Sequence, residues 1–275
     1  MKGFVARRWP VSGLLLACWA SAAWPVAAQA PVAGRTEIVA VLGAGKGAQF
    51  SLPQVRLADE QVAERINRAI ARAVLREAGE PVDTSVALPR QLRQIASRPC
   101  CLHGARFQTL LNQGALLSLK LTLEITGAYA YERSVYLVFD TGSGQRLKLD
   151  ALVADPPAQL LRRLETAINR RIGEFLTDSA GRDRAKQADL TERYGWDKAK
   201  RRIRFSTTAA PGEASALSLA EFALTPHALL LFYQVGLPAT MLTDVPEETY
   251  RFPYTHLQTK GRLAELVQKG ASATH

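Results

Sequence analysis

The most constraining feature of this chain is a strict alternation of side chains between residues 116 and 126. Leu or Ile occupies each odd position from 117 to 125, and Ser, Lys, Thr or Glu occupies each even position from 118 to 126. Successive side chains of a β-strand point to opposite faces, so this period of two predicts a half-buried strand. We therefore expect a sheet with one apolar face that other segments must cover.

Two more strands are predicted after the alternating one, at residues 134–139 and 145–149. The sequence Asp-Thr-Gly-Ser-Gly at 140–144 lies between them and has the residues of a hairpin turn. The three strands then form an antiparallel meander. A shorter strand is expected at 37–42, whereas residues 81–108 show no clear period and are expected to be irregular.

Two amphipathic helices are predicted to cover this sheet. Asp59 has the side chain of an N-cap, apolar residues then follow at helical spacing, and Gly79 ends the pattern. Asp155 and Pro156 are expected to start the second helix, whose apolar face extends to Leu176. The arginines on the polar side of the first helix are interpreted as a solvated face: Arg65, Arg68, Arg72 and Arg76. The polar side of the second helix holds Arg162, Arg163, Arg170 and Arg171.

The C-terminal third predicts a hairpin at 222–233, a closing strand at 250–252 and a last helix at 261–269. The fold class is therefore α+β: an antiparallel meander sheet packed by two amphipathic helices, with a C-terminal hairpin and closing strand. We divide the chain into an N-terminal α+β part, 37–110, and a C-terminal α+β part, 111–275. A charged stretch at 181–204 is interpreted as an excursion from the second part.

Residues 1–28 have the organisation of an export signal. A short basic start precedes an apolar run, and small residues close it at Val26-Ala27-Ala28. The apolar run is shorter than the roughly 20 residues of a membrane-spanning helix, so we predict cleavage after Ala28, a flexible leader at 29–36 and a periplasmic or secreted protein with no transmembrane helix in the mature chain. Lipidation at Cys18, in a sequence similar to a lipobox, is the alternative.

The chain has a net charge of +10, and only three of its 35 Lys and Arg residues and none of its 25 Asp and Glu residues lie before residue 29. A basic exported protein is attracted to anionic lipid, glycan or protein surfaces. Nucleic acid is not expected as a partner in that compartment. No cofactor motif is present, and the oligomeric state is left open.

Cys100 and Cys101 are adjacent, and consecutive Cα atoms are about 3.8 Å apart, which is shorter than the usual span of a disulfide. A strained vicinal ring, an intermolecular bridge and free thiols all remain open. Together with His103 the pair makes a loose cluster, too small for a metal site, and no metal is predicted.

The strongest catalytic motif is the Asp-Thr-Gly-Ser at Asp140, which matches the loop of aspartic proteases. That chemistry needs two carboxylates that share a proton, and the chain holds one such motif, so an enzyme of this kind would be a homodimer. The glycines lead directly into the next predicted strand, and we favour a plain turn. We therefore lean toward a protein that is not an enzyme.

Recognition is the other hypothesis. Arginine binds carboxylate or phosphate through two parallel hydrogen bonds, and an aromatic face stacks on a sugar or on a guanidinium. The residues with this chemistry lie in the charged stretch or next to the predicted meander: Arg201, Arg202, Arg204, Tyr194, Trp196, Tyr129 and Tyr131. The first five favour an anionic glycan or an acidic protein patch as the ligand.

Several motifs follow one another along the chain: LPQV at 52–55 with the helix at 59–70, LLSL at 116–119, FDTG at 139–142 with LKLDAL at 147–152, FALTPHAL at 222–229 and RFPYTHL at 251–257. In this order they resemble an exported family of unknown function. The C-terminal module of that family also forms the extracellular part of a lysozyme-sensing anti-sigma factor and accompanies a peptidoglycan deacetylase.

The resemblance implies a two-part α+β fold and a role in binding or sensing at the cell envelope. Family members often have Gly-Gly-Ala-His-Pro after the central strand, whereas this chain has Thr-Gly-Ala-Tyr-Ala at 126–130 and lacks the histidine. Lysozyme recognition is known for only one branch of the family, so we do not transfer that partner. The sequence predicts a non-catalytic binding or sensing domain whose partner is an envelope protein or an anionic glycan.

Overall fold

The structure is a computed structural model, and the residues that it describes all belong to one compact unit, Ala33–His275. The described ranges are 37–42, 50–83, 87–96, 101–126, 130–180, 188, 190–192, 194–203, 205, 217–234 and 246–272. The predicted signal, the leader, Cys100, Tyr129 and Arg204 lie outside them. Among the described residues, no helix has the length and apolarity needed to cross a membrane.

The predicted alternating strand is the central strand of an antiparallel three-stranded sheet. β4 (Leu116–Thr126) pairs with β3 (Cys101–Gln113) on one side and with β5 (Ala130–Asp140) on the other. β1 (Glu37–Leu42) and β2 (Ser51–Arg56) pair antiparallel, and a parallel bridge joins Phe50 to Ala105 of β3. The predicted domain boundary at residue 110 falls within β3.

Helix α1 (Glu60–Glu77) begins and ends where its sequence predicts. The Asp59 side chain accepts hydrogen bonds from the backbone N–H groups of Gln61 and Val62, at 2.9 and 3.1 Å. Gly79, at φ +72°, ends the helix in the left-handed conformation that glycine adopts without strain. The apolar side of α1 packs on the odd-numbered residues of β4 and forms one hydrophobic cluster with them.

The segment predicted to be irregular, 81–108, is in fact largely regular. It holds α2 (Leu88–Ala96), which packs on α1 and β3, and most of β3 itself. The helix has only nine residues, too few to display a clear period. The register of β3 shifts between Leu102 and Gly104 and again between Thr109 and Leu111, and such bulges reverse the alternation on which a sequence-based prediction depends.

The prediction of a third meander strand at 145–149 is also wrong. Only Arg146 makes a bridge, to Phe139, and the chain then enters a 3-10 turn, η1 (Leu149–Ala151). The reason is burial: Leu149 and the two residues after η1, Leu152 and Val153, are drawn into a second hydrophobic cluster. The turn at 140–144 itself is as predicted.

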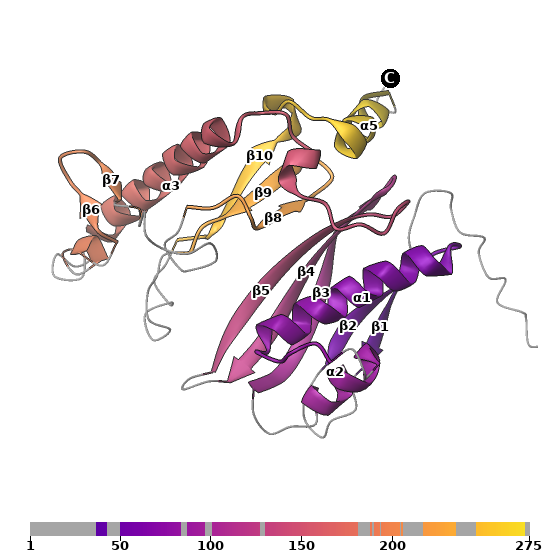
Figure 1. Cartoon of the computed structure of the whole chain (residues 1–275). Helices are drawn as coiled ribbons and strands as arrows, with labels where there is room; N and C mark the ends of the chain where they lie inside the picture. Colours follow the sequence, from indigo (N-terminus) through magenta and orange to yellow (C-terminus); the bar gives the residue numbers. More distant parts are fainter. Residues whose placement is uncertain are drawn as a thin grey trace, which may run out of the picture. The chain divides into compact units, whose positions relative to one another are not determined.

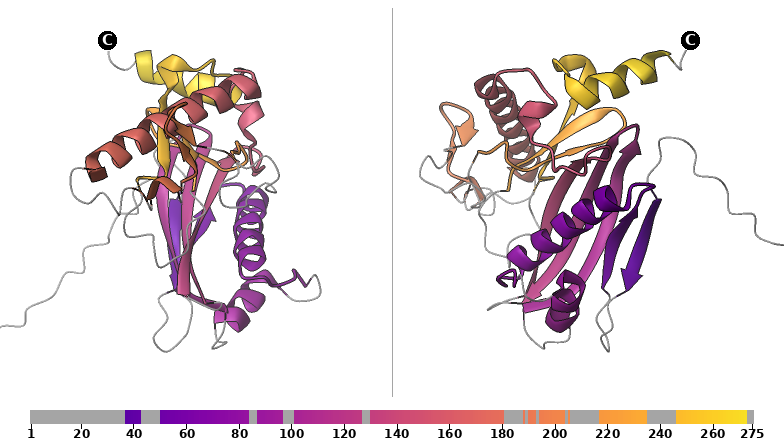
Figure 2. Two further views of the ribbon diagram at one scale, coloured as in Figure 1. Left: turned by 90° about the vertical axis from the view of Figure 1, so that its left-hand side faces the viewer. Right: turned by 45° about the vertical axis from the view of Figure 1, so that its right-hand side comes forward.

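The second cluster lies around a separate antiparallel sheet of β8 (Phe222–Leu224), β9 (Ala228–Phe232) and β10 (Thr249–Pro253). Figures 1 and 2 show this sheet on the other side of β3–β5 from α1 and α2. The backbone N–H of Leu224 donates to the Ser118 Oγ at 3.0 Å. Ser118 and Thr122 are therefore buried too, so the half-buried prediction for β4 is wrong over this stretch.

Helix α3 (Pro157–Ala180) covers the second cluster and contacts β10 and β7. A small hairpin of β6 (Trp196–Asp197) and β7 (Arg202–Ile203) lies beside it, within the stretch predicted as an excursion. The chain ends in η3 (Tyr254–His256) and α5 (Gly261–Ser272). The predicted α+β class, the C-terminal hairpin, the closing strand and the last helix are confirmed.

Candidate functional site

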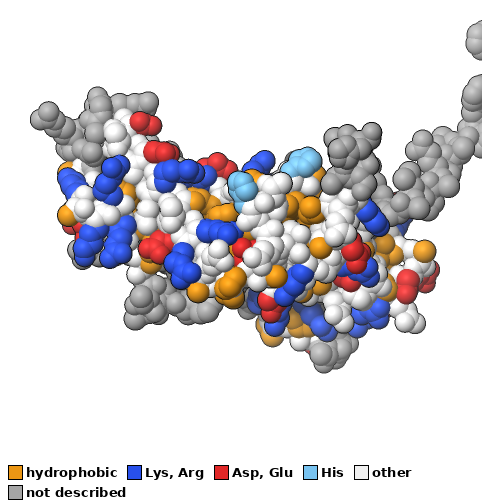
Figure 3. Space-filling model, turned by 90° about the horizontal axis from the view of Figure 1, so that it is seen from above, with side chains coloured by type: hydrophobic (Ala, Val, Ile, Leu, Met, Phe, Trp, Pro, Cys, Tyr) orange, Lys and Arg blue, Asp and Glu red, His pale blue; other side chains and the backbone are white. Residues whose placement is uncertain are grey.

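Helix α3 has two faces of opposite character. Its inner residues recur every four positions and are buried: Leu160, Leu164, Ile168, Ile172 and Leu176. The outer face carries polar side chains, among them Arg162, Thr166 and Arg170. Figure 3 shows the side of the molecule that carries α3, with Lys and Arg side chains along it and hydrophobic side chains between them.

A buried carboxylate anchors the start of α3. The Asp155 side chain is 1 % exposed and accepts the Gln258 N–H at 2.6 Å, while its other oxygen lies 3.1 Å from the Arg163 guanidinium. Arg163 in turn donates to the carbonyl of His256 at 2.8 Å. Asp155 therefore does not cap α3 as predicted. It joins the first turns of α3 to the segment that follows β10.

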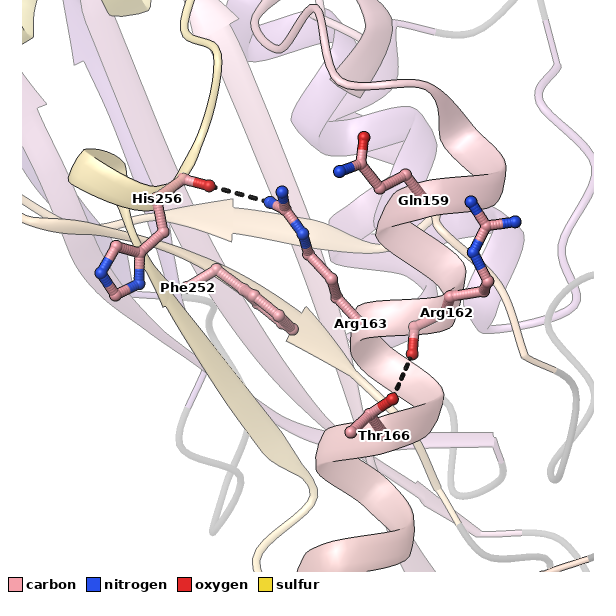
Figure 4. Close-up of a pocket in the computed structure, with 6 residues that line it drawn as sticks. All are labelled: Gln159, Arg162, Arg163, Thr166, Phe252 and His256. Carbon is pink, nitrogen blue, oxygen red and sulfur yellow. Dashed lines mark hydrogen bonds between the residues drawn. The ribbon is translucent and has the colours of Figure 1, made fainter.

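An open hollow of about 690 Å³ lies between α3 and the end of β10. Gln159, Arg162, Arg163 and Thr166 line it from α3, and Phe252 and His256 line it from β10 and η3. Figure 4 shows the Phe252 ring between His256 and α3, with Arg163 reaching across to η3. Arg163 is thus fixed by its partners, whereas the Arg162 guanidinium takes part in none of the described ion pairs.

A second hollow, of about 560 Å³, lies where the β6–β7 hairpin meets α3. The Asn169 side chain accepts the Ile203 N–H at 2.8 Å and so ties the hairpin to the helix. The Trp196 ring lies on Gly173: a Cβ added there would be 3.1 Å from the ring carbon Cη2. Arg170 and Arg201 also line this hollow, together with the carboxylates of Glu174 and Asp178.

The structure brings some predicted recognition residues together and separates others. Trp196 and Arg201 line the second hollow, and Arg202 is exposed on β7. Tyr194 is buried against Phe175 in the core, not on the surface. Tyr131 is 47 % exposed on β5, part of a different element. Cys101 is the first residue of β3, and its backbone pairs with that of Thr126 in β4.

The Asp140 carboxylate is engaged in its own turn. It accepts the Gly142 N–H at 2.7 Å and lies 3.5 Å from the Arg262 guanidinium, while the Asp140 carbonyl accepts the Gly144 N–H. These are the contacts of a turn between β5 and the following segment. In the described part of the chain, no three His, Cys, Asp or Glu side chains gather as metal ligands.

Sequence reasoning missed the first hollow. The sequence predicts only that Arg162, Arg163 and Arg170 lie on the polar side of the second helix, and it marks Phe252 and His256 only as parts of a motif. The available signal was spacing: positions 159, 162, 166, 170 and 173 follow one another at intervals of three or four and so share one face of a helix. The contribution of β10 and η3 had no local signal.

Comparison with known proteins shows a likeness in fold to solved structures of low sequence identity. No protein-family model matches the chain, and no curated protein matches it. The crystal structure of a DUF3298 family protein from Pseudomonas aeruginosa PAO1 is similar, with a TM-score of 0.50 and 16 % identity, over 83 % of this chain and 95 % of that one. A DUF3298 member from Bacteroides fragilis aligns over 85 % and 96 %, with 15 % identity and a TM-score of 0.46.

The first of these likenesses shows that the chain shares its fold with a protein of the DUF3298 family. The α+β fold that the motif resemblance implies is thus shared with a protein of a family of unknown function, and membership in that family stays a prediction. The relations to the anti-sigma factor and to the deacetylase remain predictions.

Proposed function

We propose that this protein is an exported, non-catalytic binding protein of the cell envelope that holds an anionic group in the hollow between α3 and β10. The observation that carries the proposal is the position of Arg162. Its guanidinium lines an open hollow, and none of the described ion pairs includes it. A planar guanidinium in this state offers a carboxylate or a phosphate two parallel hydrogen bonds.

The surroundings of Arg162 suit such a ligand. Gln159 adds an amide, and Phe252 adds an apolar surface at the base of the hollow. Asp155 and the His256 carbonyl hold Arg163 in place beside the hollow, and Asp155 balances its charge, so Arg162 is the guanidinium left for an anionic ligand. Without residues 1–28 the chain keeps 32 Lys and Arg against 25 Asp and Glu, a net charge of 32 − 25 = +7, which attracts an anionic ligand over a longer range.

Export and envelope location belong to the same proposal. They are supported by the basic start, apolar run and small closing residues of 1–28. The fold of a DUF3298 family protein is compatible with a non-catalytic domain. The ligand is an anionic glycan or an acidic envelope protein.

The test compares residues 29–275 with two single variants, Arg162→Gln and Arg72→Gln. Arg72 is exposed on α1, so both variants lose one charge from a helix surface while keeping a good helix former. Retention is measured on polygalacturonate and on isolated peptidoglycan at low and high salt. We expect Arg162→Gln to weaken retention about tenfold, equal to about 1.4 kcal/mol, and Arg72→Gln to leave it unchanged.

Equal losses in the two variants would show that only net charge matters and would contradict a site at Arg162. Absence of retention on every anionic matrix would contradict the proposal as a whole. An Asp140→Asn variant in a general protease assay tests the homodimeric protease alternative. That alternative requires the unsubstituted protein to cleave the substrate and the variant to lose this activity.

A further inference from the structure

The two hollows lie along one continuous face of α3. Among the residues that line them from the helix, those at positions 159, 162, 166, 170, 173 and 177 form one stripe, each three or four residues after the last. Arg163, Asn169, Glu174 and Asp178 line the hollows beside this stripe. An α-helix rises 1.5 Å per residue, so this stripe is about 27 Å long. We call it the α3 track, defined by these six residues.

The α3 track is polar along its length and aromatic at its two ends. The Thr166 and Thr177 hydroxyls donate to the helix carbonyls of Arg162 and Gly173, at 2.8 and 2.7 Å, so their oxygens remain available as acceptors. Phe252 lies at one end and Trp196 at the other. Aromatic rings in these positions offer flat apolar faces against which a sugar ring packs.

Two positively charged side chains are also spaced along the track. Arg162 and Arg170 are two helical turns apart, about 12 Å. Neither guanidinium belongs to an ion pair in the described part of the chain. The second hollow also holds the Glu174 and Asp178 carboxylates, which Arg170 and Arg201 together match in number. A ligand with one negative group every few ångströms would therefore meet both arginines, whereas a small anion would meet only one.

A folded protein partner fits this face less well. The core of a protein–protein interface is rich in exposed aromatic and apolar side chains. Among the described residues, the large hydrophobic side chains that are clearly exposed are Val82 and Tyr131, and neither lies on α3 or beside it. The track offers arginines, hydroxyls and two partly buried rings instead.

We infer that the ligand is an extended, carboxylate-bearing glycan strand that lies along the α3 track. One end packs on Phe252 and pairs with Arg162, and the other packs on Trp196 and pairs with Arg170. This inference rests on the proposed function and extends it, because it makes the second hollow part of the same binding site. It predicts that affinity depends on the length of the glycan.

The chain supplies its own reporter for the far end of the track. Trp196 is the one tryptophan in residues 29–275, so any change in tryptophan fluorescence of that segment reports on the second hollow. The probes are a galacturonate dimer and a galacturonate hexamer, titrated into the protein while fluorescence and binding heat are recorded. The dimer is too short to contact both hollows.

We expect the hexamer to bind at least about tenfold tighter than the dimer, because the second contact is made within an already bound ligand. Only the hexamer should change the Trp196 emission. Arg170→Gln should remove the advantage of the hexamer and leave dimer binding intact, Arg162→Gln should weaken both probes, and Arg72→Gln should affect neither. Gly173→Ala, whose new Cβ would press on Trp196, should act as Arg170→Gln does.

The outcomes separate this inference from the function on which it rests. Equal binding of dimer and hexamer, lost in Arg162→Gln and without any change in fluorescence, would overturn the track and leave the anionic hollow standing. No binding of either probe would overturn both. Tighter binding of a glutamate hexapeptide, with the same fluorescence change, would overturn the glycan and assign the track to an acidic peptide.

Discussion

The two long helices, α1 and α3, have similar amphipathic patterns and different surroundings. Each buries an apolar face and presents arginines on the other. On α1 three of the four arginines have partners: Arg68 pairs with Glu64 at 2.5 Å, the Arg65 Nε donates to the Ser143 carbonyl at 3.0 Å, and Arg76 pairs with Glu77 at 2.9 Å. On α3, β10 and the β6–β7 hairpin flank the helix and leave hollows beside Arg162 and Arg170.

The neighbours of an arginine-rich helix face therefore decide whether it borders a hollow. On α1 most of the charges are matched by nearby acceptors, and Arg72, which has no described partner, lies on an exposed surface without a hollow beside it in the described pockets. On α3 the arginines that contact neighbouring segments, Arg163 and Arg171, are fixed by backbone carbonyls, which leaves the outer pair for a ligand. Four predictions test how far this contrast holds.

The largest losses of unfolding free energy should come from substitutions on the buried apolar faces, which both helices have. Ile66 of α1 and Ile168 of α3 are both fully buried, in different hydrophobic clusters. Either residue changed to Ala should lower the free energy of unfolding by about 2–5 kcal/mol. Urea denaturation followed by circular dichroism measures this, and a loss below about 1 kcal/mol for one helix would show that its cluster is loosely packed.

The contacts of Asp59 before α1 and of Asp155 before α3 should contribute different amounts to the free energy of unfolding. Asp59→Ala removes an exposed cap from α1 and should cost about 1 kcal/mol. Asp155→Ala removes a buried carboxylate that holds both Gln258 and Arg163, and should cost about 2–3 kcal/mol because hydrogen bonds to a charged group are the stronger ones. The same denaturation assay compares them. Equal losses would mean that the long-range anchor of α3 adds nothing to a local cap.

Alkaline pH should lower the stability of the protein through tyrosines that are buried in the second hydrophobic cluster, next to α3. Burial raises the pKa of Tyr233 and of Tyr250 to about 12. Both residues belong to the second hydrophobic cluster, which α3 covers, whereas the described cluster of α1 and β4 contains no tyrosine. In the unfolded chain these phenols ionise near pH 10. Between about pH 10 and 12 the folded state therefore holds more protons, so stability falls as pH rises and is fully present below pH 10.

The measurement for this prediction is the melting temperature across the alkaline range, together with the ultraviolet absorbance of tyrosinate. Tyr250→Phe is the matched variant, and it should reduce the pH dependence of the melting temperature. A steeper dependence in the variant, or tyrosinate appearing in the folded protein near pH 10, would contradict the burial of these rings.

The smallest changes in the free energy of unfolding should come from substitutions of arginines on the exposed helix faces. Arg68→Gln breaks an exposed pair with Glu64 on α1 and should cost about 0.3–0.5 kcal/mol. Arg162→Gln should leave the free energy of unfolding unchanged within error, since its guanidinium belongs to no described ion pair. A clear loss of stability in Arg162→Gln would show that this side chain has a structural partner and would weaken its assignment to a ligand.

Much of the fold was predictable because it depends on local periodicity and local caps. The alternation in β4, the apolar spacing and Asp59 cap of α1, the β8–β9 hairpin and α5 all follow from neighbouring residues. The segments that were predicted wrongly lack such signals. Two bulges interrupt β3, α2 is short, and residues 145–149 leave the sheet so that Leu149 can reach the second cluster.

The candidate site was predictable only in part. Trp196 and Arg201 were selected because aromatic and guanidinium groups suit an anionic ligand, and the structure places both beside the second hollow. Tyr194, chosen on the same ground, is in the core. Chemical type identifies residues capable of recognition, but burial decides which of them a ligand can reach.

The α+β class, the two amphipathic helices and the positive charge follow from the sequence alone, because they depend on residue type and on spacing within a few turns or strands. The two hollows beside α3 follow only from the tertiary structure. The contact that holds Arg163 to His256 spans 93 residues, and Trp196 meets Gly173 from a separate hairpin. Contacts between segments so far apart are set by packing, which no local pattern encodes.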